Sequence, residues 1–241
     1  MVEAAKKSGV RKIIFTSSVA VYGFTQHDTD ESGEFRPFNE YGRTKLEAEA
    51  VYQEWVRKSP DRSLTIIRPT VVFGEGNRGN VYNLLNQIAS GKFIMVGSGR
   101  NHKSMAYVEN IAAFLKHSLT FGAGEYIFNY ADKPDFDMNT LIRLVNKKLG
   151  KGNSVGLRFP YWLGYMGGLA FDIAGRITGK KYSISVIRMK KFCSDTQFSS
   201  AGIQQTGFVL PRSLAEGLER TIQFEFLDPK TDKHKVVFYT E

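Results

Sequence analysis

The sequence predicts an α/β protein, with a parallel sheet in residues 1–135 and a smaller, mainly helical region in residues 136–241. Two runs rich in β-branched and aromatic residues, 12–17 and 64–73, have the composition of buried parallel strands. Helical patterns alternate with such runs as far as residue 130, which is typical of an α/β fold. Beyond that point helical patterns dominate, without repeats or a low-complexity linker.

The individual elements follow from local patterns. The helix expected over 41–57 has apolar residues near helical spacing, among them Leu46, Ala50 and Val56. The polar stretch 26–39 is expected to be a loop, because it contains both glycine and proline. The remaining helices are expected over 2–9, 81–89, 111–119, 138–149, 161–177 and 214–226, and the remaining strands over 93–96 and 126–130.

Charge and composition limit the classes of function. The net charge is +9, from 33 basic and 24 acidic residues, and between Val155 and Ser194 the only acidic residue is Asp172. Such a basic region favours an anionic membrane or a phosphorylated substrate, and because no nucleic-acid-binding motif accompanies it we expect no nucleic acid partner. The single cysteine, Cys193, excludes an internal disulfide and fits a reducing cytosol. The four histidines are scattered, so no metal site is expected.

Three residues indicate the chemistry. Ser18 follows the first expected strand, at the edge where open α/β sheets bind ligands. Tyr41 and Lys45 lie four residues apart in an expected helix and therefore project from one face. An ammonium group beside a phenol favours the phenolate, which can take a proton from a sugar or alcohol hydroxyl as hydride leaves the carbon. Ser18 would hydrogen-bond the same oxygen.

A glycine-rich motif has a different interpretation. Glycines at 74, 76 and 79 match G-x-G-x-x-G between a strand and a helix. A dinucleotide-binding turn also needs an acidic residue about 20 positions later, and there is none between Gly76 and Val108. We therefore expect these glycines to shape a loop beside the substrate.

The chain resembles the extended short-chain dehydrogenase/reductase family, which includes the NAD-dependent nucleotide-sugar epimerases and dehydratases. The resemblance is carried by Thr16-Ser17-Ser18-Val19-Ala20-Val21-Tyr22-Gly23, Tyr41-Gly42-Arg43-Thr44-Lys45, Arg68-Pro69-Thr70-Val71-Val72-Phe73-Gly74 and Ser104-Met105-Ala106-Tyr107-Val108-Glu109-Asn110. It implies part of a Rossmann-like NAD-binding domain with interleaved substrate-side segments in 1–135, a substrate-binding region in 136–241, and NAD as the cofactor.

The resemblance also assigns roles to individual residues. The implied catalytic residues are Ser18, Tyr41 and Lys45; the implied cofactor-binding residues are Ser17, Tyr41, Lys45, Pro69 and Val72; the implied substrate-binding residues are Ser18, Asn80 and Lys103. Lys103 stands where relatives often have a diphosphate-binding arginine. A lysine supplies the positive charge but cannot make the paired hydrogen bonds of a guanidinium group. Val71 replaces a frequent asparagine, which indicates a different substrate.

The implied activity is that of an NAD-dependent sugar 4-epimerase for O-antigen or surface polysaccharide synthesis. It would interconvert N-acetylglucosamine and N-acetylgalactosamine on diphospho-undecaprenol or on a nucleotide diphosphate, at the cytoplasmic face of the bacterial inner membrane. A homodimer is compatible with the family. Two alternatives stay open: a dehydrogenase or reductase with net redox change on a sugar or sterol, and a non-catalytic remnant.

Residues 1–17 bear on cofactor binding. They are too few for the βαβ unit of about 30 residues that carries the phosphate-binding turn in this family. We expect that the dinucleotide-binding segment is missing from these 241 residues and that they are inactive by themselves. We also expect them to retain no NAD and to self-associate through an open strand edge.

The apolar segment 159–174 contains five aromatic residues, and it also contains Pro160 and Asp172. It is shorter than the roughly 20 residues that span a bilayer. Two interpretations remain: a core helix of the substrate domain, or an interfacial helix whose basic neighbours meet anionic lipid. The second predicts peripheral membrane association.

Overall fold

The computed structural model describes residues 1–24, 28–179 and 186–228. Within them the chain forms two compact units that interleave along the sequence. The first contains Met1–Asn77, Ser104–Pro134 and Gln197–Leu218, and the second contains Arg78–Lys103, Asp135–Thr196 and the remaining C-terminal residues. The division predicted at residue 135 stays a prediction, and one of the crossings between the units falls there.

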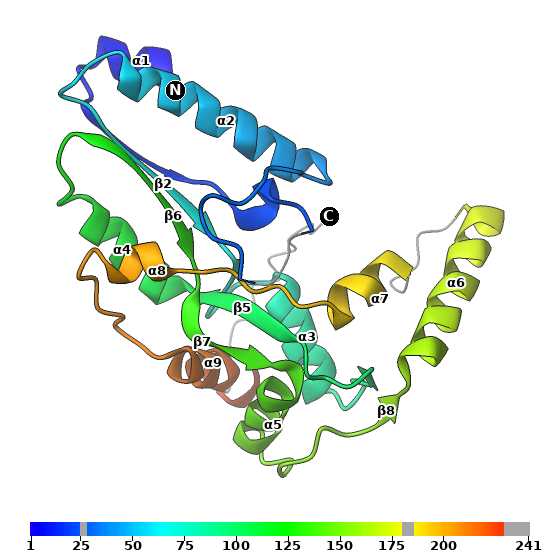
Figure 1. Ribbon diagram of the computed structural model, residues 1–241. Helices are drawn as coiled ribbons and strands as arrows, with labels where there is room; N and C mark the ends of the chain where they lie inside the picture. Colours follow the sequence, from blue (N-terminus) through cyan, green and yellow to red (C-terminus); the bar gives the residue numbers. More distant parts are fainter. Residues whose placement is uncertain (25–27, 180–185, 229–241) are drawn as a thin grey trace. The chain divides into compact units, whose positions relative to one another are not determined.

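The first unit is built on a parallel sheet (Figure 1). Its strands are β1 (Lys12–Thr16), β2 (Ser63–Pro69) and β6 (Gly124–Tyr130), in the order β1-β2-β6. Both pairings are parallel, and Thr16 pairs with Ile67 while Arg68 pairs with Asn129. The carboxyl ends of all three strands therefore lie along one edge of the sheet, which confirms the predicted α/β class with a parallel sheet.

Helices cover both faces of this sheet. Helices α1 (Val2–Lys7) and α2 (Glu40–Arg57) contact each other, and Trp55 and Val56 of α2 pack against alternate strand residues such as Leu64 and Ile66. On the other face, α4 (Val108–Ser118) contributes Phe114 to a cluster with Ile67 and Phe128. Because both faces of the sheet are covered, the sequences of these strands are almost continuously apolar.

The structure corrects the single strand expected over 64–73. The segment forms β2 and then β3 (Val71–Phe73), which pairs with β5 (His102–Tyr107) in a second sheet of order β3-β5-β7. Pro69 has no N–H to continue the first ladder, and the backbone N–H of Thr70 donates to the carbonyl of Tyr130 at 3.0 Å. The chain leaves one sheet for the other at this point.

The second unit is mainly helical. Its elements are α3 (Asn80–Ala89), β4 (Met95–Val96), α5 (Met138–Lys148), β8 (Arg158–Phe159), α6 (Tyr161–Thr178) and α7 (Val186–Cys193). Strands β5 and β7 (Asp132–Asp137) and helix α9 (Leu214–Ile222) run from one unit into the other, and the short α8 (Ala201–Gln204) belongs to the first. Strands β5, β7 and β8 and helices α7 and α8 were not predicted.

Candidate active site

Ser18 begins a tight turn directly after β1. Its backbone is extended, and its Oγ accepts the N–H of Ala20 at 3.1 Å, which caps the short 3₁₀ helix Val19–Val21. Because Oγ serves as the acceptor in this cap, its own hydrogen remains able to donate to a substrate oxygen. Ser18 is half-buried at the carboxyl edge of the sheet.

Helix α2 begins against this turn through Gly42. A Cβ on Gly42 would lie 2.5 Å from the carbonyl oxygen of Ala20, so a larger residue would push the two segments apart. The side chain of Asn39 caps the helix by accepting the N–H of Gly42 at 2.9 Å. Tyr41 therefore enters α2 immediately beside the turn that Ser18 begins.

Tyr41 and Lys45 share a face of α2, as predicted. The Lys45 Nζ lies 5.7 Å from the centre of the Tyr41 ring and 5.1 Å from that of Phe15. It donates to the carbonyl of Thr16, the last residue of β1, at 2.9 Å. The ammonium group is thereby held between the strand end and the phenol ring, and 47% of Tyr41 is exposed. This arrangement places a phenol next to a positive charge.

The other three predicted cofactor-binding residues, Ser17, Pro69 and Val72, lie in or directly after strands of the first unit. Ser17 follows β1 and is 2% exposed, and its Oγ has no hydrogen-bond partner in the described residues. Pro69 is the last residue of β2, and Val72 is half-buried in β3. Thr70, between the two strands, also has a buried Oγ1 with no hydrogen-bond partner among the residues that the structure describes.

A buried polar network lies beneath these residues, and the sequence analysis missed it. Glu49 and Arg68 form an ion pair in which each side chain is 1% exposed. Burial opposes the charge of Arg68, but the hydrogen bonds and charge of Glu49 outweigh it and raise the pKa of the guanidinium. The available signal was an arginine inside a buried strand, because such a residue requires a partner.

The glycine-rich loop connects the two units. A Cβ on Gly74 would lie 2.3 Å from Cγ1 of Val108, so this glycine permits a close approach in the first unit. The hydroxyl of Tyr107 donates to both carboxylate oxygens of Glu75, at 2.9 and 3.0 Å. Asn80 is exposed at the first position of α3 in the second unit. A role for this loop beside the substrate stays a prediction.

Lys103 belongs to the second unit and caps a helix there. Its Nζ donates to the carbonyls of Lys191 and Ser194, at 2.8 and 2.6 Å, at the C-terminal end of α7. Burial lowers the pKa of the ammonium group to about 8. At the other end of α7, a carboxylate oxygen of Asp172 accepts the N–H of Val186 at 3.1 Å. Opposite charges thus lie at the two ends of α7, as a helix dipole favours.

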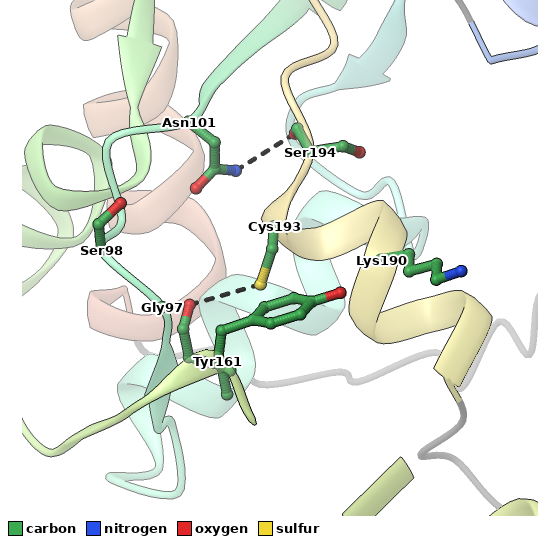
Figure 2. A pocket seen from close by; sticks show the side chains of 8 residues that line it. Gly97, Ser98, Asn101, Tyr161, Lys190, Cys193 and Ser194 are labelled. Atoms are coloured by element: carbon green, nitrogen blue, oxygen red, sulfur yellow. Dashed lines mark hydrogen bonds between the residues drawn. The ribbon is translucent and has the colours of Figure 1, made fainter. Parts of the chain in front are cut away.

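A pocket of about 500 Å³ lies beside this helix (Figure 2). Its walls combine β4 and the following loop with α6 and α7, and its lining residues are Val96, Gly97, Ser98, Asn101, Tyr161, Lys190, Cys193 and Ser194. Cys193 Sγ lies 3.5 Å from the carbonyl oxygen of Val96, and burial raises the pKa of the thiol. These residues are far apart in the sequence and share no motif, so sequence reasoning could not have assembled them.

Helix α6 presents an unusual amount of apolar surface. It packs closely at Gly164, where a Cβ would lie 2.5 Å from Met189 and 2.6 Å from Val96. Its exposed large apolar side chains are Tyr161, Trp162, Leu163, Tyr165, Met166, Leu169, Phe171 and Ile173. Of the two interpretations of this segment, the core helix does not describe these exposed side chains. Among the described residues, no helix is long and apolar enough to cross a membrane.

Comparison with known proteins identifies the family. Residues 1–131 match the model of the NAD-dependent epimerase/dehydratase family. The chain is also 55% identical over 231 residues to N-acetyl-α-D-glucosaminyl-diphospho-ditrans,octacis-undecaprenol 4-epimerase of Escherichia coli O157:H7, covering 95% of this chain and 70% of that protein. The chain belongs to the NAD-dependent epimerase/dehydratase family.

Two solved structures of similar fold support the assignment of the architecture. UDP-glucose 4-epimerase of Thermotoga maritima, solved with UDP-glucose, has a TM-score of 0.67 at 20% identity, covering 92% of this chain and 66% of that one. UDP-glucuronic acid 4-epimerase of Bacillus cereus, solved with NAD, has a TM-score of 0.68 at 19% identity, covering 92% and 64%. The chain thus spans about two thirds of the length of these relatives of the epimerase/dehydratase family.

Proposed function

We propose that these 241 residues form the catalytic and substrate-binding part of a sugar 4-epimerase that acts on N-acetylglucosamine linked through a diphosphate to undecaprenol. The observation that carries the proposal is the contact of Gly42 with Ala20, through which the Tyr41–Lys45 face of α2 begins beside the turn of Ser18. The 55% identity to an enzyme named for this reaction supports the substrate class.

The residues of this chain would handle the proton of the sugar 4-hydroxyl. Tyr41 takes that proton and later returns it to the same oxygen, which is general base and then general acid catalysis. Lys45 stabilises the phenolate by its charge, and Ser18 donates a hydrogen bond to the reacting oxygen. Because Tyr41 would return the proton that it takes, these residues would end in their starting state, as a reaction without net redox change requires.

The residues at the strand ends fit the nicotinamide end of NAD. Within the described part of the chain, the buried hydroxyl of Ser17 has no hydrogen-bond partner. Lys45 holds a positive charge at the end of β1 beside the partly exposed ring of Tyr41. Pro69 is buried at the end of β2, and Val72 is half-buried in β3. When bound, NAD supplies the hydride acceptor and donor. We propose Ser17, Tyr41, Lys45, Pro69 and Val72 as the residues that hold this end of the cofactor.

On the substrate side, we propose Ser18 at the sugar and Asn80 and Lys103 near the diphosphate. Lys103 does not line the pocket, but its Nζ donates to the carbonyl of Ser194, which is a lining residue. Its charge can favour an anion there without direct contact. Lys190 lines the same pocket with an exposed ammonium side chain.

The assay compares two diphosphate substrates in the full-length enzyme. We expect N-acetylgalactosamine to form from the undecaprenol-linked sugar with a higher kcat/KM than from UDP-N-acetylglucosamine, and no NADH to accumulate. Stoichiometric NADH would instead favour a dehydrogenase of the same family. Absence of product from both substrates, with NAD bound, would reject the epimerase proposal.

We also propose that α6 attaches the enzyme peripherally to the membrane that holds its lipid-linked substrate. Aromatic and aliphatic side chains cover α6, and Lys190 and Lys191 of the adjacent α7 are exposed. An apolar helix surface near lysines is the pattern of interfacial helices on anionic bilayers. Flotation with phosphatidylglycerol vesicles should recover the protein at low salt and progressively less as salt rises. No association at low salt would exclude this attachment.

A further inference from the structure

The ion pair of Glu49 and Arg68 is part of a longer chain of hydrogen bonds. Arg68 donates from Nε to Oε1 of Glu49 at 3.0 Å and from Nη2 to Oε2 at 2.6 Å. Its Nη1 donates to the Tyr22 hydroxyl at 2.6 Å, which donates to Oδ1 of Asn129 at 2.8 Å. All four residues are at most 1% exposed. We call Glu49, Arg68, Tyr22 and Asn129 the buried polar chain.

One end of the buried polar chain attaches helix α2 to the sheet. Tyr41, Lys45 and Glu49 follow one another at intervals of four residues and share one face of the helix. Lys45 binds the end of β1 at Thr16, and Glu49 binds Arg68 near the end of β2. The face that carries Tyr41 is thus fixed at two points on adjacent strands.

The other end attaches the turn that begins at Ser18. Tyr22 ends the 3₁₀ helix Val19–Val21, and its hydroxyl lies between Arg68 and Asn129, which are paired residues of β2 and β6. Burial raises the pKa of Tyr22, so the hydroxyl keeps the proton that it donates. Glu31 adds a further contact to Asn129, because its Oε1 accepts the backbone N–H of Asn129 at 2.7 Å.

Stability alone gives a weak reason for such an arrangement. Apolar residues of similar volume in place of a buried ion pair often leave a protein equally or more stable. Directional hydrogen bonds, by contrast, define distances and angles that apolar packing leaves looser. A chain that joins the helix of Tyr41 to the turn of Ser18 is suited to define the geometry between them.

We propose that the buried polar chain positions Tyr41 and Ser18 relative to each other, so that Glu49, Arg68, Tyr22 and Asn129 are positioning residues of the reaction. The inference rests on the proposed function for the role of Tyr41 and Ser18. The geometric part is independent of it, since it concerns how two segments of one unit are held.

The test uses Tyr22→Phe and Glu49→Gln in the full-length enzyme. Each removes a polar group of the chain with little change of volume. Matched controls are Tyr126→Phe, whose hydroxyl has only a 3.5 Å contact to the carbonyl of Ala123, and Glu47→Gln, an exposed partner of Arg43 on the same helix. We expect kcat to fall by roughly 10- to 100-fold in Tyr22→Phe and Glu49→Gln, because a displacement of a catalytic group by about 1 Å can cause such a loss. KM should change little, and the controls should match the unmodified enzyme.

A second measurement does not depend on turnover. With 3-fluorotyrosine at position 41, the ¹⁹F resonance should shift or broaden in Tyr22→Phe and Glu49→Gln and stay unchanged in the controls. If the unmodified enzyme proves inactive on sugar diphosphates, the proposed function fails while this measurement still decides the positioning. Unchanged kcat and an unchanged resonance in folded variants would overturn the inference.

If single substitutions prevent folding, the double variant Glu49→Leu with Arg68→Met replaces the ion pair by apolar side chains and should fold. We expect it to show the same loss of kcat and the same change of the fluorine resonance. A folded double variant with the kcat and resonance of the unmodified enzyme would show that the pair serves only stability.

Discussion

Helices α2 and α6 each have 18 residues, yet their exposed surfaces differ in character: that of α2 is charged and that of α6 is apolar. Exposed charged residues of α2 pair with each other, as Arg43 does with Glu40 and Glu47, and its buried face carries Glu49 beside Trp55 and Val56. Helix α6 has only two charged residues, Asp172 and Arg176, and much of its surface is exposed and apolar.

Under the proposed function, this difference suits two different tasks on the same secondary structure. In α2, polar side chains find partners within the first unit: Lys45 donates to Thr16, and Glu49 accepts from Arg68. In α6, large apolar side chains remain exposed, which is unusual unless a partner or a membrane covers them. Geometry matters for proton transfer, whereas membrane attachment requires only apolar area and charge.

The largest expected effect concerns the sheet beneath α2. Among the described residues, β1 pairs with β2 alone, and residues 1–17 contain no glycine-rich phosphate turn. We therefore expect the 241 residues, expressed by themselves, to retain no NAD and to self-associate through the open edge of β1. Light scattering after size-exclusion chromatography, with NAD measured after acid release, checks both points. A monodisperse monomer that carries NAD would contradict the prediction.

Tyr41→Phe separates chemistry from structure in α2. The substitution removes the proton acceptor, so turnover of the full-length enzyme should fall by about 10² to 10⁴, the range that general acid–base groups contribute. Far-UV circular dichroism and the melting temperature should stay the same, because Tyr41 is largely exposed. Tyr52→Phe on the same helix is the control. Epimerisation at the unmodified rate would remove Tyr41 from the mechanism.

Trp162→Glu tests the surface of α6 in the same way. Loss of one large apolar contact costs about 2 kcal/mol, and the added negative charge repels anionic lipid. Binding to phosphatidylglycerol vesicles should weaken roughly 30-fold, as that free energy implies. Val51→Glu introduces the same side chain at an exposed position of α2 and should leave vesicle binding unchanged. Equal losses in both variants would show that net charge, and not α6, controls attachment.

The last expected effect is a pH dependence of stability at the cap of α7. The pKa of Lys103 is about 8 in the folded chain and 10.5 for an ordinary lysine. Between these values the unfolded chain binds more protons at this side chain, so the free energy of unfolding rises with pH there. Relative to Lys103→Met, the unmodified protein should therefore gain stability from pH 8 to 10.5 in urea unfolding. Exposed Lys92→Met is the control, and a pH-independent difference would contradict the buried cap.

Much of the fold could be predicted because it depends on local patterns. The helices expected over 41–57, 81–89 and 161–177 agree closely with α2, α3 and α6. Their apolar spacing is a property of each segment alone. The strand expected over 64–73 was divided between two sheets, because pairing partners distant in the sequence decide where a strand ends. The short strands β5 and β7 show no clear alternation of apolar and polar residues, and their position also depends on pairing partners distant in the sequence.

The sequence by itself determined the family, with NAD as its cofactor, and indicated Ser18, Tyr41 and Lys45 as candidate catalytic residues. Residue type and helical spacing suffice for this, because Tyr41 and Lys45 meet within one helix. Tertiary structure decided what holds them: the contact of Gly42 with Ala20 and the hydrogen bonds that join Glu49 through Arg68 to Tyr22. It also placed Lys103 as the cap of α7 and exposed α6. These relations link residues far apart in the chain, and only packing brings their atoms within a few ångströms.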